Sequence, residues 1–119
     1  MSGPPRYAIT VTITRWVSDG QPGLIACEFE DCDGTLWEVV EKEPVLGHET
    51  HLDAQSAYPT PGFIPCDILR SLAPKNGRAI VEVKTDGPMG FGIFAVDGTT
   101  VFKVFEDQLQ RWYWGGAPG

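Results

Sequence analysis

The chain contains few of the residues that build covalent, metal-bound or membrane-spanning structures. It has three cysteines and two histidines in 119 residues, and its nine lysines and arginines are outnumbered by sixteen aspartates and glutamates. An odd, low cysteine count does not fit a disulfide framework, so we expect three reduced thiols, as in the cytoplasm. No apolar run approaches the roughly 20 residues of a membrane-spanning helix, and the N-terminal segment lacks the apolar core of a signal peptide. The sequence therefore predicts a cytoplasmic protein without a membrane partner.

Aromatic residues, glycine and proline are plentiful by contrast. Six phenylalanines, four tryptophans and three tyrosines supply the apolar area that disordered chains lack, and 14 glycines with 10 prolines indicate many turns. A chain of this length fits one domain, because domains most often contain about 100–150 residues. We expect a single β domain over residues 1–119, with flexible ends at 1–6 and 115–119.

The hydrophobic pattern predicts strands almost throughout. Apolar and threonine residues alternate along Tyr7–Val17, which is the period of a half-buried strand. Pro65 is compatible with a strand over Phe63–Leu69 or with the first turn of a short helix, and we favour the strand. Further strands are expected over Leu24–Asp31, Thr35–Glu41, Ala79–Lys84, Ile93–Val96 and Thr99–Phe105, with one helical turn within Glu106–Trp114. The predicted fold is all-β, a small antiparallel barrel or sandwich of about six to seven strands with a short C-terminal helical turn.

Two Asp-Gly pairs predict tight hairpins. If Asp33 and Gly34 form a two-residue loop, Glu28 opposes Val39 and Glu30 opposes Trp37. One face then holds Ile25, Cys27, Phe29, Leu36 and Val40 as core, and the other holds Glu28, Glu30 and Glu41 around Trp37 and Val39. The same reasoning at Asp97–Gly98 sets Phe94 opposite Val101 and Ile93 opposite Phe102, so that this ribbon needs cover on both faces.

Acidic residues gather around the first hairpin. Seven acids and a single base, Lys42, occupy residues 28–43. Such a surface repels phosphate, which argues against nucleic-acid binding, and it attracts a basic protein partner. We therefore predict a partner-binding site at Glu28, Glu30, Trp37 and Glu41. A tryptophan often anchors an interface, although burial of Trp37 beneath a loop is an equally good interpretation.

Metal binding is a weaker alternative. His48 and His51, with Asp53 nearby, lie in a long proline-rich connection over residues 43–62, which is either functional or contains an unrecognised short strand. Zinc needs three or four convergent ligands, and this pair supplies at most half of them unless Cys66 joins. Two solvated histidines are the simpler interpretation, so no cofactor is expected, with zinc as the alternative.

The remaining cysteines and tryptophans suggest packing roles. Cys27 alternates with apolar neighbours and is expected in the core, whereas Cys32 beside the turn is expected to be exposed. Trp16, Trp112 and Trp114 form either an exposed aromatic patch or part of the core.

Catalytic motifs are missing. The sequence contains neither the GxSxG of a nucleophile elbow nor the GxGxxG of a phosphate-binding loop. The first hypothesis is a non-enzymatic acidic binding module, an inhibitor or immunity-type protein by analogy of size and charge. The alternatives are a small metal-binding barrel or hydrolase using the histidines, and an accessory subunit of a bacterial assembly.

Overall fold

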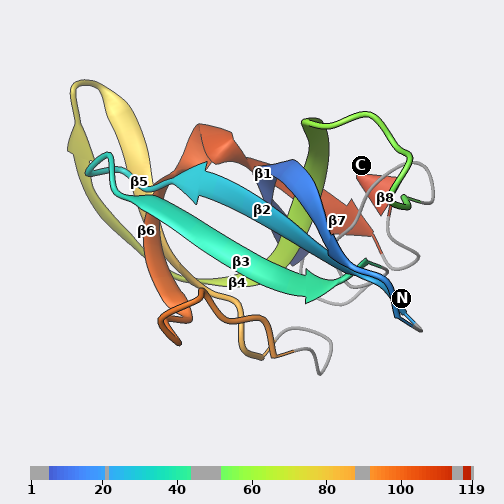
Figure 1. Cartoon of the computed structure of the whole chain (residues 1–119). Coiled ribbons are helices and arrows are strands. Elements are labelled where there is room, and N and C mark those ends of the chain that lie inside the picture. The colour runs from blue at the N-terminus through green and yellow to red at the C-terminus, as the bar shows by residue number, and fades with distance from the viewer. Residues whose placement is uncertain (1–5, 21, 44–51, 88–91, 114–116, 119) are drawn as a thin grey trace.

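The computed structural model describes residues 6–20, 22–43, 52–87, 92–113 and 117–118, and β-strands dominate these ranges (Figure 1). The strands are β1 (Arg6–Ser18), β2 (Leu24–Glu30), β3 (Leu36–Lys42), β4 (Thr60–Lys75), β5 (Arg78–Lys84), β6 (Val101–Phe105), β7 (Leu109–Tyr113) and β8 (Ala117–Pro118). A turn of 3-10 helix, η3 (Glu106–Gln108), separates β6 from β7. These ranges contain no α-helix.

The strands form a curled antiparallel sheet in the order β3-β2-β1-β4-β5-β6. One edge of β1 pairs with β4, and its other edge is shared by β7 at the start of β1 and by β2 further along. The chain that leaves β6 at the far end of the order therefore returns to the centre through β7. This return gives the sheet its barrel-like curvature and confirms the predicted all-β antiparallel fold.

The long strand β4 joins the two halves of the sheet. Its first part, as far as Cys66, pairs with β1, and its second part, from Asp67, pairs with β5. The register shifts between Ile68 and Arg70, and such a bulge bends a strand. The strand interpretation of Phe63–Leu69 is confirmed, and β4 extends well beyond it, with Pro65 opposite Ala8 of β1.

The core fills the concave side of the sheet. Its fully buried apolar side chains come from β1 to β6 and from the segment before β6: Ile9, Ile13, Ile25, Cys27, Val39, Ile64, Cys66, Val83, Ile93 and Val104. In β1 the isoleucines and Val11 are buried while Thr10 and Thr12 are exposed, as the alternation predicts. Both the buried and the exposed residues of β1 are thus mostly β-branched, and such residues favour the extended backbone of a strand.

The second Asp-Gly turn forms, but its first arm is not a strand. Ala95 donates to Thr99 and Gly98 donates to Ala95, which makes Val96, Asp97 and Gly98 a three-residue loop. The predicted two-residue loop is therefore wrong by one position. Residues 92–96 run outside the sheet, whereas β6 pairs with β5.

Apolar side chains around this turn remain uncovered. Phe94 is 50%, Val96 67% and Val101 45% exposed, while Ile93 and Phe102 are buried. The expectation that both faces of this ribbon are covered is wrong, and an apolar surface remains on one side of it.

The ends of the chain match the predictions in part. The helical turn is confirmed as η3, but β7 follows it directly because Arg6–Ile9 of β1 offers a free edge for pairing. Of the ends expected to be flexible, Arg6 belongs to β1 and Ala117–Pro118 form β8. The other residues of both ends lie outside the described part of the chain.

Candidate protein-interaction face

The turn between β2 and β3 decides which side chains share a face. Asp31 donates its N–H to Thr35 (2.9 Å) and Gly34 donates to the carbonyl of Asp31 (3.1 Å), so the loop contains three residues. Gly34 has φ of +80°, whereas Asp33 is not among the described residues with positive φ. This is a type I turn followed by a glycine bulge, and the Asp31 carboxylate holds it by accepting from the N–H groups of Asp33 and Thr35.

The extra loop residue shifts the predicted register by one. Trp37 opposes Phe29, Val39 opposes Cys27 and Glu38 opposes Glu28. Because successive strand residues point to opposite faces, this shift moves every β3 side chain to the other side of the sheet. Val39 is buried and Leu36 is 57% exposed, which reverses the predicted assignment.

The predicted site is therefore divided between two faces. Glu28 and Glu30 lie on the outer face of the sheet, together with Leu36 and Glu38. Trp37 and Glu41 belong to the face that contains the core, where Glu41 pairs with Ile25 at the end of the hairpin. The acidic face centred on Trp37 is not formed. We call the set Glu28, Glu30, Leu36 and Glu38 the outer acidic face.

Two glutamates of the outer acidic face lie directly across from each other. Glu28 and Glu38 are Cα partners in the ladder. Counting in twos from the bonded pair Asp31–Thr35, they form a non-hydrogen-bonded pair, in which opposed side chains are closest. Like charges in such a pair destabilise a sheet.

Little of this charge is neutralised within the chain. Arg15 lies 3.7 Å from a Glu38 oxygen, but both side chains are about half exposed, with relative exposures of 52% and 46%, so the pair is weak. Among the residues that the structure describes, Glu28 and Glu30 form no ion pair. Glu28 and Glu30 therefore carry negative charge that no ion pair in the described residues neutralises.

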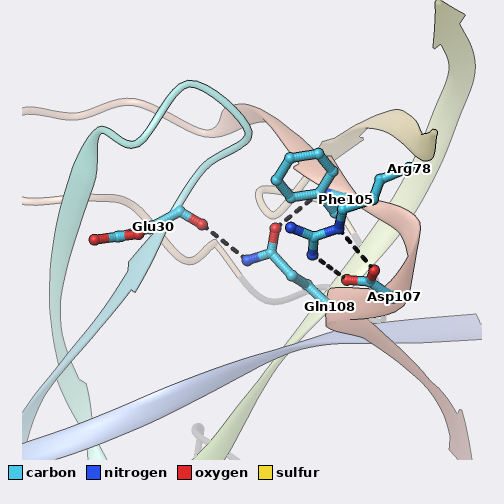
Figure 2. A network of polar contacts seen from close by, with 5 residues as sticks. All are labelled: Glu30, Arg78, Phe105, Asp107 and Gln108. Carbon is cyan, nitrogen blue, oxygen red and sulfur yellow. Dashed lines mark hydrogen bonds and ion pairs between the residues drawn. The ribbon is translucent and has the colours of Figure 1, made fainter. Parts of the chain in front are cut away.

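Glu30 is positioned through its backbone rather than its carboxylate. Gln108 of η3 donates to the Glu30 carbonyl (2.8 Å) and accepts from the Phe105 N–H (2.9 Å). Figure 2 shows this bridge, with the Glu30 carboxylate directed away from it. Beside it, Arg78 forms two bonds to Asp107 (2.6 and 3.0 Å) and lies 3.5 Å from the centre of the Phe105 ring. The network fixes the end of β2 against β6 and leaves the Glu30 charge outside.

Trp37 is partly buried, as one of its two interpretations expected, and the structure shows only contacts within the chain for it. Its indole N–H donates to Asp31 (2.9 Å), and its ring meets Phe102 edge to face at 5.1 Å. It is half-buried against the core. The remaining exposed part of the ring borders a groove.

This groove lies between β3 and the turn at Asp97. Its volume is about 370 Å³, and its walls come from Thr35, Leu36, Trp37, Glu38, Ala95, Val96 and Asp97. Val96 donates its N–H to the Glu38 carbonyl (2.9 Å), which holds the two segments side by side. Leu36, Glu38 and Val96 were not predicted as site residues. The two-residue loop had assigned Leu36 to the core. We call this site the β3 groove.

The alternative metal site is not assembled in the described residues. His48 and His51 lie outside them, and within them no group of three potential metal ligands occurs. Asp53 accepts from Gln55 and Ser56 in a local turn. Cys66 is fully buried in the core, where desolvation raises the pKa of its thiol to about 12. Such a thiol is a poor metal ligand, because ligation needs the thiolate.

The other two cysteines are also buried and unbridged. Cys27 is in the core as predicted, and its pKa is raised to about 12 by burial and then by Glu38, Glu28 and Glu41. Cys32 is 7% exposed, so the prediction of an exposed thiol is wrong. Its backbone explains the burial, since Cys32 donates to the Lys103 carbonyl (2.8 Å) and its own carbonyl accepts from Lys75.

The proposed aromatic patch can be placed only at Trp16. Its ring covers Gly23, where a Cβ atom would overlap it, and its indole N–H donates to Asp19 (2.9 Å). Trp16 thus packs partly against the core. Trp114 and the Trp112 side chain lie outside the described part of the structure.

Comparison with known proteins adds no assignment. No family model, curated protein or solved structure matches this chain. Within the described residues, no helix has the length and apolar character required to cross a membrane.

Proposed function

We propose that this protein is a non-enzymatic acidic binding module that docks a basic protein through the outer acidic face. The observation that carries the proposal is the direct opposition of Glu28 and Glu38, with Glu30 and exposed Leu36 next to them. The pair costs stability in the free protein. A cationic group between the two carboxylates removes that cost, so a basic partner gains binding free energy there.

The same face suits fast and selective association. Fixed negative charge steers a basic surface toward it and raises the association rate, most strongly at low ionic strength. Leu36 adds an apolar centre that a partner can desolvate, while the surrounding glutamates form a polar rim. If the partner uses its basic surface to bind nucleic acid, docking here inhibits it. The buried, unbridged thiols are compatible with action in a reducing cytoplasm.

Matched charge reversals test the proposal. One variant carries Glu28→Lys with Glu30→Lys, and the control carries Asp19→Lys with Asp86→Lys, at two exposed acids that do not belong to the face. Both change the net charge equally. Each tagged protein is used to capture partners from a lysate of the native cell at low and high salt, with the bound proteins quantified by mass spectrometry.

The two variants separate a local site from a general charge effect. We expect a basic protein that binds the unmodified chain and the control but not the face variant, with an association rate at low salt reduced about tenfold or more by the face substitutions. Equal loss of partner capture in both variants would show that binding depends on net charge and not on the outer acidic face. Equal retention in both would show that the outer acidic face is not the site.

A further inference from the structure

The β3 groove has walls and a rim of different chemistry. Leu36 and Val96 are large apolar side chains exposed by 57% and 67%, and Ala95 and the half-buried Trp37 complete the apolar lining. Glu38 and Asp97 supply the acidic groups among its lining residues. An apolar slot with carboxylates at its rim fits a side chain that has an aliphatic stem and a cationic end.

Hydrogen bonds favour the ionised form of the Asp97 carboxylate. Its Oδ1 accepts from the Thr99 N–H (3.0 Å), and hydrogen bonding by Thr99 lowers the pKa of Asp97. Asp31 accepts from the indole N–H of Trp37, a lining residue, and adds a further acidic group next to it. No lysine or arginine is among the residues that line the groove, and Arg15 reaches Glu38 only in a weak pair in which both side chains are about half exposed. Asp97 forms no ion pair among the described residues, so a cation from outside the chain can still bind there.

We propose that the β3 groove receives an arginine side chain of the docked protein, with the stem between Leu36 and Val96 and the guanidinium at Glu38 and Asp97. Arginine fits better than lysine because its planar group bonds carboxylates in pairs and stacks on aromatic rings. The inference rests on the proposed function and names what the partner must present. It also joins the groove to the outer acidic face, since Leu36 and Glu38 belong to both.

Small probes test the groove without an identified partner. We would titrate ¹⁵N-labelled protein with N-acetyl-arginine methylamide, and with the citrulline and norleucine analogues as neutral polar and apolar controls. The Val96 amide and the Trp37 indole N–H report from inside the groove. We expect saturable shifts at both signals with the arginine probe, and binding at least about tenfold weaker with citrulline, which lacks the charge.

Two variants sharpen this titration. Asp97→Asn keeps the acceptor for Thr99 and removes the charge, so arginine binding should weaken by about threefold to tenfold. Leu36→Ala should weaken it as well, whereas Leu69→Ala, at a leucine that is 45% exposed on β4, should leave it unchanged.

Other outcomes overturn the inference. Equal binding of citrulline and arginine, or no shift at Val96 and Trp37 at the solubility limit of the probe, rejects a cation site. Tighter binding of norleucine assigns the groove to an apolar side chain, and concentration-dependent shifts without any probe assign it to a second copy of the chain. If arginine fails here while Glu28→Lys with Glu30→Lys still abolishes capture, only the groove is wrong. If arginine binds but capture survives those reversals, only the outer acidic face is wrong.

Discussion

Two hairpins of the same sheet differ in the charges that lie opposite each other across their strands. In β4–β5, Arg70 opposes Glu82 with their side chains 3.1 Å apart, and Glu82 in turn opposes Lys103 of β6. In β2–β3, Glu28 opposes Glu38. The first row alternates in sign across three strands, which stabilises a sheet, whereas the second sets like charges together.

The turn ends of the two hairpins contact each other, so their different charge patterns occur in neighbouring parts of the sheet. Lys75 at the end of β4 lies 3.6 Å from an Asp33 oxygen in the β2–β3 turn. Both tips lie at the same side of the molecule, away from the chain ends (Figure 1). Bases near the β4–β5 turn are thus paired within the chain, by Asp33, Asp107 and Glu82. The charges on β4–β5 are thus largely paired within the chain, whereas Glu28 and Glu30 on β2 form no ion pair among the described residues.

The largest expected effect concerns two thiols of the core, Cys27 on β2 and Cys66 on β4. Cys27 and Cys66 have pKa values raised to about 12 from 9.0 by burial, Cys27 additionally by Glu38 and Glu28. Above pH 9 the unfolded chain loses these protons while the folded chain keeps them, so stability falls as pH rises toward 12. We expect a loss of about 2 kcal/mol per thiol between pH 9 and about pH 11.

Denaturant unfolding at several pH values, with reductant present, measures this slope. The slope is the change in the free energy of unfolding per pH unit above pH 9. Cys27→Ala and Cys66→Ala should each reduce its size by the contribution of about one proton, even if they also change the stability at neutral pH. An unchanged slope in both variants would mean that the thiols ionise equally in the folded and unfolded chains.

The second effect tests the register on which the comparison depends. Val39→Ala should lower the free energy of unfolding by about 2 kcal/mol, because it opens a cavity in the core. Leu36→Ala should change it by less than about 0.5 kcal/mol, because that leucine is exposed. Thermal or denaturant unfolding of the two variants decides the matter, and the reverse order would restore the register with a two-residue loop.

The third effect is confined to the paired hairpin. Glu82→Gln removes the acid between Arg70 and Lys103 and should cost about 0.5–1 kcal/mol, more at low salt than at high salt. Glu106→Gln, at an exposed acid with no ion pair among the described residues, serves as the control. A cost equal to that of the control would show that the alternating row contributes nothing.

The sequence predicted the strands well, because alternation and turn residues are local signals. It failed at the loop length of both Asp-Gly turns, since a positive-φ glycine ends either a two-residue or a three-residue loop. The tighter loop needs positive φ at both residues, and Asn76–Gly77, with φ of 53° and 77°, provides it after β4. Asparagine adopts that conformation readily, whereas the aspartates at 33 and 97 do not adopt it here.

The composition of β2 and β3 contained a signal that could have corrected the site. With a three-residue loop, one face holds Ile25, Cys27, Phe29, Trp37 and Val39 with a single charged residue, Glu41, and the other collects three glutamates and Lys42. That separation of apolar and charged residues is cleaner than the one with a two-residue loop. The β3 groove, however, depends on the contact between Val96 and Glu38, which joins segments far apart in the chain and has no local signature.

The smallest change gives the most direct test of the account. Glu28→Gln keeps the shape of the side chain and removes one of the two opposed charges, so stability and partner capture are measured on the same variant at low and high salt. We expect the free energy of unfolding to rise by a few tenths of a kcal/mol at low salt, and capture of the basic partner to weaken. A fall in stability, or undiminished capture, would contradict the claim that this charge is kept for binding at the expense of the fold.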